Sequence, residues 1–307
     1  MTSLGEGVRE LVRPPFANYD VVVYFGCGLF ALPLIYHYLV EPSQLRFPRF
    51  HFDLGMPFAN EAISTLSLLF AVYLLGHIIA YTSSLLIERA IDVFYGKVSS
   101  AILLSNHSQG GDKQELVNAW IYSLTREAFE SGRRLQNILR VVAHIPVLPL
   151  YVLISLIGGF DYYRTRVPKH VMFLAGKKLH DGGYGPVGLR EAWYKTLEHI
   201  VINSHPGATA RMYNYLVISG LFRSLSLLFL ACIWAEAYYA AMCLMSGDYP
   251  LRPLLSDANT IPAHLFNIAL LYTAFGFSIS SYMKFQRRYA EEAIFAFVLS
   301  PAGKPAA

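Results

Sequence analysis

The chain has 307 residues, of which 54% are hydrophobic and 15% are charged, and its formal net charge is +4. With a mean hydropathy of +0.38, this composition departs from that of water-soluble globular domains and indicates that a lipid bilayer is the solvent. The basic residues lie beside long apolar runs and do not cluster with aromatic side chains that could stack on nucleic-acid bases. We therefore expect no nucleic-acid partner.

Four apolar runs are long enough to cross a bilayer as helices. An α-helix rises about 1.5 Å per residue, so about 20 mostly apolar residues cross the hydrocarbon core. The runs cover residues 21–40, 63–87, 216–244 and 261–285. Glu6, Glu10 and a Pro14-Pro15 pair precede the first run and argue against a removable signal peptide. We therefore predict an all-α membrane protein with four transmembrane helices.

A fifth apolar run, residues 141–160, competes with these four, although Pro146 and Pro149 weaken it as a straight helix. The basic residues decide against a fifth span, because cytoplasmic loops are enriched in Lys and Arg. With four spans, 21 of the 25 basic residues fall on one side, one lies within a span, and three lie opposite: Arg46, Arg49 and Arg252. The fifth run is then re-entrant, interfacial or buried in the cytoplasmic domain, and its proline-broken pattern favours a re-entrant or interfacial segment.

This topology places both termini in the cytoplasm of a multi-pass protein of the plasma or inner membrane. The predicted order is an N-terminus at 1–20, spans within 21–87, a cytoplasmic helical domain at 88–215, spans within 216–285, and a tail at 286–307. In the central domain, apolar residues recur at helical spacing over 116–128 and 189–201. The fourth helix is predicted to continue to Glu292, with pairs Arg287–Glu291 and Arg288–Glu292 on its surface.

Polar residues follow one face of the second span: Tyr73, His77, Tyr81, Ser84 and Glu88 are separated by steps of four, four, three and four. Ionisable groups within a membrane are expensive unless they face a bundle interior or a water-filled cavity. The stripe therefore indicates either an ion or proton path, or hydrogen bonding and aromatic packing between helices.

Arg223 is a charged residue within the third span, about 10 Å from its cytoplasmic end. It requires a partner or water, with Ser219 and Ser226 on its face. Snorkelling to the cytoplasmic headgroups, a pair with Glu88, a pore-lining position and a lipid-phosphate contact all satisfy this requirement.

Glu236 follows thirteen residues later, about 20 Å along the helix and on another face, so the two charges cannot pair. We expect Glu236 to approach His264 or Asn267 near the outer interface. Cys232 and Cys243 share a face with it, but they are about 16 Å apart along the axis, too far for one metal ion. We expect no metal site and no cofactor.

Small residues repeat every four positions in three spans, a pattern that lets another helix approach closely in lipid. They are Gly76 and Ala80, Gly220 and Ser224, and Gly276 and Ser280. In the central domain, Lys177, Lys178 and His180 precede a glycine-rich stretch and indicate a contact with an anionic headgroup or nucleotide phosphate, or simply a solvated turn.

The sequence contains no catalytic motif of a known enzyme class, and we expect no enzymatic activity. The favoured hypothesis is a homo-oligomeric channel or pore-like membrane effector controlled by its cytoplasmic domain. A docking subunit that recruits a soluble cytoplasmic protein is the alternative. A membrane enzyme acting on lipid headgroups is the third.

Overall fold

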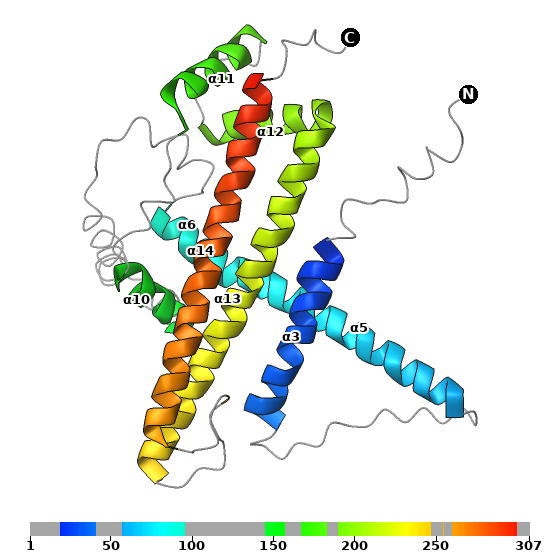
Figure 1. Ribbon diagram of the computed structural model, residues 1–307, viewed down its shortest axis with the longest axis vertical. Coiled ribbons are helices and arrows are strands. Elements are labelled where there is room, and N and C mark those ends of the chain that lie inside the picture. Colours follow the sequence, from blue (N-terminus) through cyan, green and yellow to red (C-terminus); the bar gives the residue numbers. More distant parts are fainter. Residues whose placement is uncertain are drawn as a thin grey trace, which may run out of the picture. The chain divides into compact units, whose positions relative to one another are not determined.

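The computed structural model describes residues 19–40, 57–95, 145–156, 167–182, 190–246, 254 and 260–299. All regular structure among these residues is helical, and no strand occurs there (Figure 1). The predicted all-α class is therefore confirmed for the described part. The predicted helix at 116–128, the segments 1–18 and 300–307 and the end of the fifth apolar run lie outside it.

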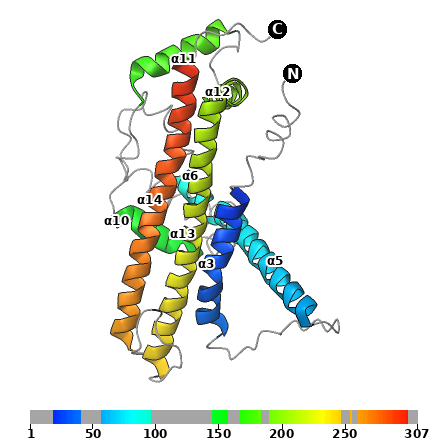
Figure 2. The ribbon, with the colours of Figure 1, turned by 45° about the vertical axis from the view of Figure 1, so that its right-hand side comes forward.

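Four helical stretches are long and apolar enough to cross a membrane. The first consists of η1 (Asp20–Phe25), α3 (Gly26–Ile35) and η2 (Tyr36–Val40). The second consists of α5 (Pro57–Ser83), η3 (Ser84–Glu88) and α6 (Arg89–Tyr95). The third is α13 (Pro206–Ser246) and the fourth is α14 (Ile261–Leu299), which Figure 2 shows from another side.

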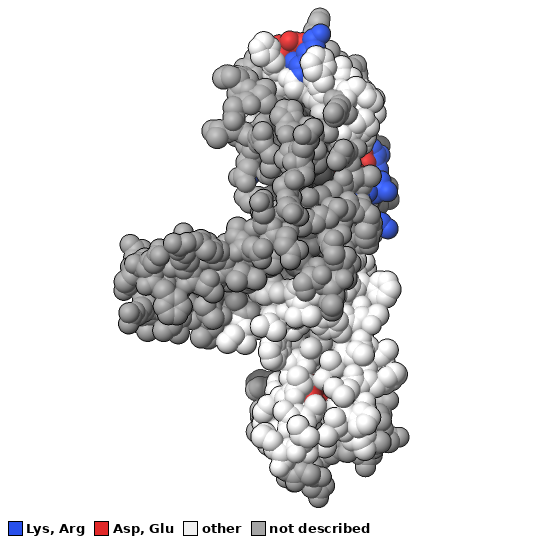
Figure 3. Space-filling model, turned by 90° about the vertical axis from the view of Figure 1, so that its left-hand side faces the viewer, with Lys and Arg blue, Asp and Glu red and all other residues white. Residues whose placement is uncertain are grey.

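The last two helices are longer than the predicted spans. Helix α13 begins at Pro206 and not near 216, because proline is well suited to the first helical position, where no amide partner is required. Residues 224–246 contain Glu236 as their only Asp, Glu, Lys or Arg, and residues 261–283 contain none. In Figure 3, broad areas of the described surface contain no Lys or Arg, and Lys and Arg gather in other areas.

Three described segments, η1, η2 and η3, are π-helical. Pro33 lies inside α3 and lacks the amide that would continue the hydrogen-bond ladder, and the π-helical turns of η2 begin three residues later. In η3 the wider turn interrupts the four-residue step on which the predicted polar stripe depends, because Ser84 and Glu88 are its first and last residues.

Two compact units divide the chain, and each is described by itself. Unit 1 comprises Met1–Leu85 and Gly220–Ile279, and unit 2 comprises Leu86–Ser219 and Ser280–Ala307. Helices α13 and α14 each contribute residues to both units.

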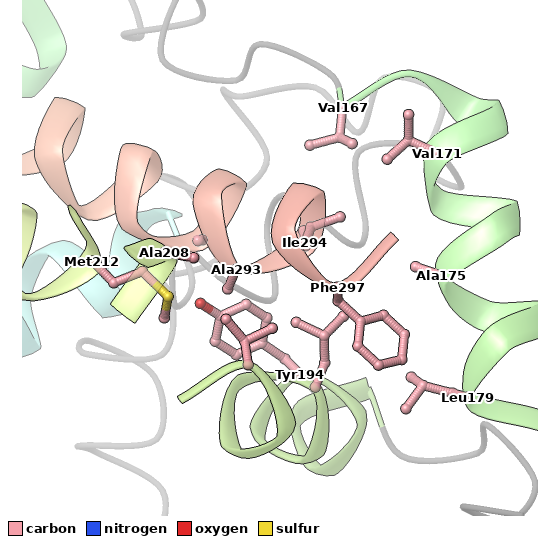
Figure 4. Close-up of a cluster of buried hydrophobic side chains, with 13 residues drawn as sticks. Val167, Val171, Ala175, Leu179, Tyr194, Ala208, Met212, Ala293, Ile294 and Phe297 are labelled. Atoms are coloured by element: carbon pink, nitrogen blue, oxygen red, sulfur yellow. The ribbon is translucent and has the colours of Figure 1, made fainter. Parts of the chain in front are cut away.

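Unit 2 is built on α11 (Lys169–Asp181), α12 (Arg190–Ser204), the first turns of α13 and the last turns of α14. Helix α12 confirms the helix predicted over 189–201. Figure 4 shows the apolar core that these four helices share. Its members are Val167, Val171, Ala175, Leu179, Tyr194, Leu197, Val201, Ala208, Met212, Ala290, Ala293, Ile294 and Phe297.

The surface ion pairs of α14 differ in part from the prediction. Arg287 pairs with Glu291 at 3.0 Å, as predicted. Glu292 pairs with Arg211 of α13, whose Nη2 lies 2.6 Å from the carboxylate, in place of the predicted Arg288. Tertiary packing of α13 on α14 supplies this partner, which spacing within one helix does not reveal.

Residues 145–156 form η4 (Ile145–Val147) and α10 (Leu148–Leu156). A helix of nine residues is about 13 Å long, less than half the hydrocarbon thickness. The described part of the fifth apolar run, residues 145–156, is not among the four helical stretches that are long and apolar enough to cross a membrane. Whether this segment is re-entrant, interfacial or buried in the domain stays a prediction.

Candidate functional site

Glu236 of α13 is fully buried and is surrounded by hydrogen-bond donors from other elements of unit 1. The hydroxyl of Tyr38 in η2 donates to its Oε1 at 2.8 Å, and the amide of Asn267 in α14 donates to the same oxygen. The backbone N–H of Leu254 also donates to Oε1, at 3.3 Å. The imidazole Nδ1 of His264 in α14 lies 2.7 Å from Oε2.

This arrangement, which we call the Glu236 cluster, joins three of the four long helical stretches. Its side chains are at most 5% exposed. Tyr239 extends it, because its hydroxyl donates to the carbonyl oxygen of Tyr38 at 2.7 Å. Each carboxylate oxygen is therefore satisfied by hydrogen bonds, which is the condition under which a charged group can be buried.

The expected approach of Glu236 to His264 and Asn267 is confirmed by these contacts. Sequence reasoning missed Tyr38 and Tyr239. A signal was available, since Tyr38 is near the end of the first apolar run and Glu236 is near the end of the third. In the predicted topology, the first and third spans both run from the cytoplasmic side to the outer side, which would bring their C-terminal ends to the same membrane face.

The residues of the polar stripe predicted for the second span have different surroundings in the structure. His77 stacks on Tyr24 of η1, with ring centroids 3.6 Å apart, and Tyr73 packs edge-on against His77 at 4.5 Å. Tyr81 is 69% exposed, and Ser84 and Glu88 are half-buried. Tyr73 and His77 therefore belong to an aromatic contact between helices, whereas the Tyr81 side chain is exposed.

Gly76 lies where the second stretch crosses the first with backbone in contact. A Cβ atom on Gly76 would overlap the carbonyl oxygen of Tyr24 and come within 2.8 Å of its Cα. On the opposing helix, a Cβ on Gly28 would lie 2.9 Å from the carbonyl carbon of Val72 and 3.1 Å from the nitrogen of Gly76. Gly76 was predicted to be a packing residue; Gly28, its counterpart, was missed.

The other small residues have different surroundings. Ala80 and Ser224 are buried, whereas Gly276 and Ser280 are half-buried. A Cβ on Gly220 would lie 2.8 Å from the hydroxyl of Tyr19, the flexible end of a side chain. The backbone crossing at Gly76 is thus more sterically restricted than the position of Gly220.

Arg223 contacts a serine of another helix. Its Nε donates to Ser83 Oγ of α5 at 3.3 Å, and that hydroxyl donates to the carbonyl of Ala80 at 2.8 Å. Ser226, predicted to share its face, donates instead to the carbonyl of Phe222 at 2.7 Å, and Ser219 donates to that of Leu216. Glu88 belongs to unit 2, so its pairing with Arg223 stays a prediction.

Lys177, Lys178 and His180 lie in the last turns of α11, and the interpretation of this stretch as a solvated turn is wrong for them. Lys178 Nζ donates to the carbonyl oxygen of Phe297 at 2.7 Å, near the C-terminal end of α14. Burial lowers the pKa of the Lys178 amine from its ordinary value. The amide of Gly182 donates to the carbonyl of Lys178, so the first glycine is a helix cap.

We expect Lys178→Met to destabilise unit 2, because Phe297 is among the last residues of α14 and its carbonyl lacks an intrahelical partner. Loss of a charged hydrogen bond at a partly exposed position costs about 1.5 kcal/mol. The measurement is thermal or SDS-induced unfolding of the full chain. Lys177→Met, an exposed change one residue away, is the matched control with an expected effect within about 0.5 kcal/mol. Equal effects of the two changes would refute the capping role.

Among the described residues, no group of three or more His, Cys, Asp or Glu could hold a metal ion. Cys232, one turn before Glu236, is buried, and Cys243 is half-buried. No protein-family model matches the chain, and no curated protein or solved structure matches it. The structure thus defines a class, a helical protein with four helices able to cross a membrane.

Proposed function

We propose that the protein is a homo-oligomeric channel or pore-like effector of the plasma or inner membrane, with both termini and the helical domain at 88–215 in the cytoplasm. The observation that carries this proposal concerns α13. Its apolar stretch includes Arg223 and Glu236, and both contact polar groups from other membrane-spanning helices. Ionisable residues inside a membrane bundle are typical of ion or proton pathways.

Two helices provide a physical basis for control by the cytoplasmic domain. Helix α13 contributes Ala208 and Met212 to the core of unit 2 and Glu236 to unit 1. Helix α14 contributes Phe297 to the same core and His264 to the Glu236 cluster. A change in the packing of unit 2 therefore acts on the helices that hold the buried charges.

The second stretch supports assembly from several copies. Of the four candidate spans it is the least covered, since 17% of its apolar window is buried. Leu66, Phe70, Ile78 and Tyr81 of α5 are each more than 60% exposed. The tyrosine hydroxyl on this apolar face favours a protein neighbour over lipid, because an unsatisfied polar group is costly in hydrocarbon.

Reconstitution in liposomes tests the proposal. Purified full-length protein should make vesicles permeable to ions, and Arg223→Gln should change conductance or ion selectivity by several-fold while the oligomer survives. Lys195→Gln, an exposed change on α12, is the matched control and should leave the flux unchanged. Assembled protein in vesicles that stay tight at every voltage would contradict the proposed channel.

A docking subunit is the second candidate, favoured by the exposed apolar residues of α11. Phe173 is 70% exposed and Leu174 is 46% exposed, beside the exposed Lys177. Copurification from native membranes of a stoichiometric partner that is lost in Phe173→Ser, together with ion-tight vesicles, would support this function over a channel.

A further inference from the structure

We propose that Glu236 and His264 form a proton-binding site and that the proton is the ion this protein carries. This inference rests on the proposed function and specifies its transported species. It starts from a buried acid–base pair, a carboxylate and an imidazole 2.7 Å apart with at most 1% of either side chain exposed.

Both oxygens of the Glu236 carboxylate already contact hydrogen-bonding groups of the protein. Oε1 accepts from Tyr38, Asn267 and the Leu254 amide. Oε2 lies 2.7 Å from Nδ1 of His264. Metal ions such as Ca²⁺ and Mg²⁺ require several oxygen lone pairs directed at one point. A proton is the cation that fits between a carboxylate oxygen and an imidazole nitrogen at this separation.

The negative charge of the Glu236–His264 pair also favours a proton. An anion would be repelled by the Glu236 carboxylate. When the imidazole is neutral, the pair carries a charge of −1. Neither residues 224–246 around Glu236 nor residues 261–283 around His264 contain a Lys or Arg that could compensate it. An uncompensated charge is costly at low dielectric, and one added proton makes the pair neutral.

The exchange is balanced without any other reactant. Loading transfers one proton from water to the imidazole–carboxylate pair and changes its charge from −1 to 0. Release returns one proton to water and restores the initial charge. A single bond from hydrogen to nitrogen or oxygen forms and later breaks, and no electrons are transferred.

The surroundings contain further groups that can exchange hydrogen bonds. Tyr38 contacts the cluster from η2, its ring centroid lies 4.8 Å from that of its neighbour His37, and Cys232 and Tyr239 belong to α13. Asn267 Oδ1 is buried with no hydrogen-bond partner among the described residues. A water molecule that entered the cluster would find a hydrogen-bond acceptor in this oxygen, beside the pair.

The test uses full-length protein in vesicles of phosphatidylcholine and phosphatidylglycerol with an internal pH dye. A potassium diffusion potential drives protons inward, and the dye reports the rate. The wild type should acidify the lumen, and Glu236→Gln and His264→Gln should each slow acidification at least tenfold. Thr273→Val, an exposed and nearly isosteric change on α14, should keep the wild-type rate.

Parallel measurements of Na⁺, K⁺ and Cl⁻ flux separate the two proposals. Wild-type vesicles that pass one of these ions but no protons would overturn the proton site and leave the channel standing. Vesicles that pass no ion would overturn both. If Glu236→Gln does not assemble, Glu236→Asp retains a carboxylate that is one methylene shorter. Its proton flux should then fall several-fold, and wild-type flux in this variant would also overturn the inference.

Discussion

Replacing Gly76 with alanine should cost unit 1 about 3 kcal/mol or more, the upper part of the range for overpacking. Alanine has the better helix propensity by about 0.5–1 kcal/mol, so propensity alone predicts a gain. We expect a net loss of stability, because the added Cβ atom overlaps the carbonyl oxygen of Tyr24 and this cost exceeds the gain in helix propensity. Backbone cannot rotate away as a side chain does, so α5 and the first stretch must separate.

The measurement is SDS-induced unfolding of the purified protein, with assembled protein followed by gel filtration. Gly207→Ala is the matched control, since nothing lies within 4 Å of a Cβ at that helical position. It should leave stability unchanged or raise it by up to about 1 kcal/mol. A Gly76→Ala protein as stable as this control would show that the helices do not cross in backbone contact.

Glu236→Leu should destabilise the protein by about 3–5 kcal/mol, the range for removing one partner of a buried charged pair. The substitution leaves Tyr38, Asn267 and His264 in an apolar site without their common acceptor. Each unsatisfied donor then contributes a desolvation cost of about 1–3 kcal/mol. The effect should therefore exceed that of removing any one donor, such as Tyr38→Phe.

A double-mutant cycle distinguishes this cause from general loss of packing. His264→Leu combined with Glu236→Leu removes both members of the pair and should recover part of the loss. Asp181→Ala, at a carboxylate that is 61% exposed, is the control and should change stability by less than about 0.5 kcal/mol. Strictly additive losses at Glu236 and His264 would contradict a direct interaction between them.

Much of the fold was predictable because its causes are local. Length and apolarity of the runs predict four long helices, which the described structure has. The small size of Gly76 predicts close packing. The approach of Glu236 to His264 and Asn267 was also predictable, since a carboxylate in a charge-free stretch requires polar partners from a neighbouring helix.

Other features depend on tertiary contacts that spacing does not encode. The spacing of Val171, Ala175 and Leu179 fits a buried helical face, yet the neighbouring lysines and glycines suggested a turn. These three residues pack into the core of unit 2, and this packing stabilises the helical conformation of α11. Likewise, Arg223 donates a hydrogen bond to Ser83 of another helix, and the π-helical turn of η3 shifts the register of the stripe after Ser83. None of these contacts follows from periodicity in one segment.

We propose that four helices cross the membrane and leave both termini and the domain at 88–215 on the cytoplasmic side. Topology mapping in intact cells tests it most directly, with single-cysteine or fusion reporters at both termini and at positions 49, 111, 183 and 252. We predict that only the reporters at 49 and 252 are accessible from outside, because the loops that contain them carry just 3 of the 25 basic residues. A C-terminus or a position 183 accessible from outside would contradict the four-span topology.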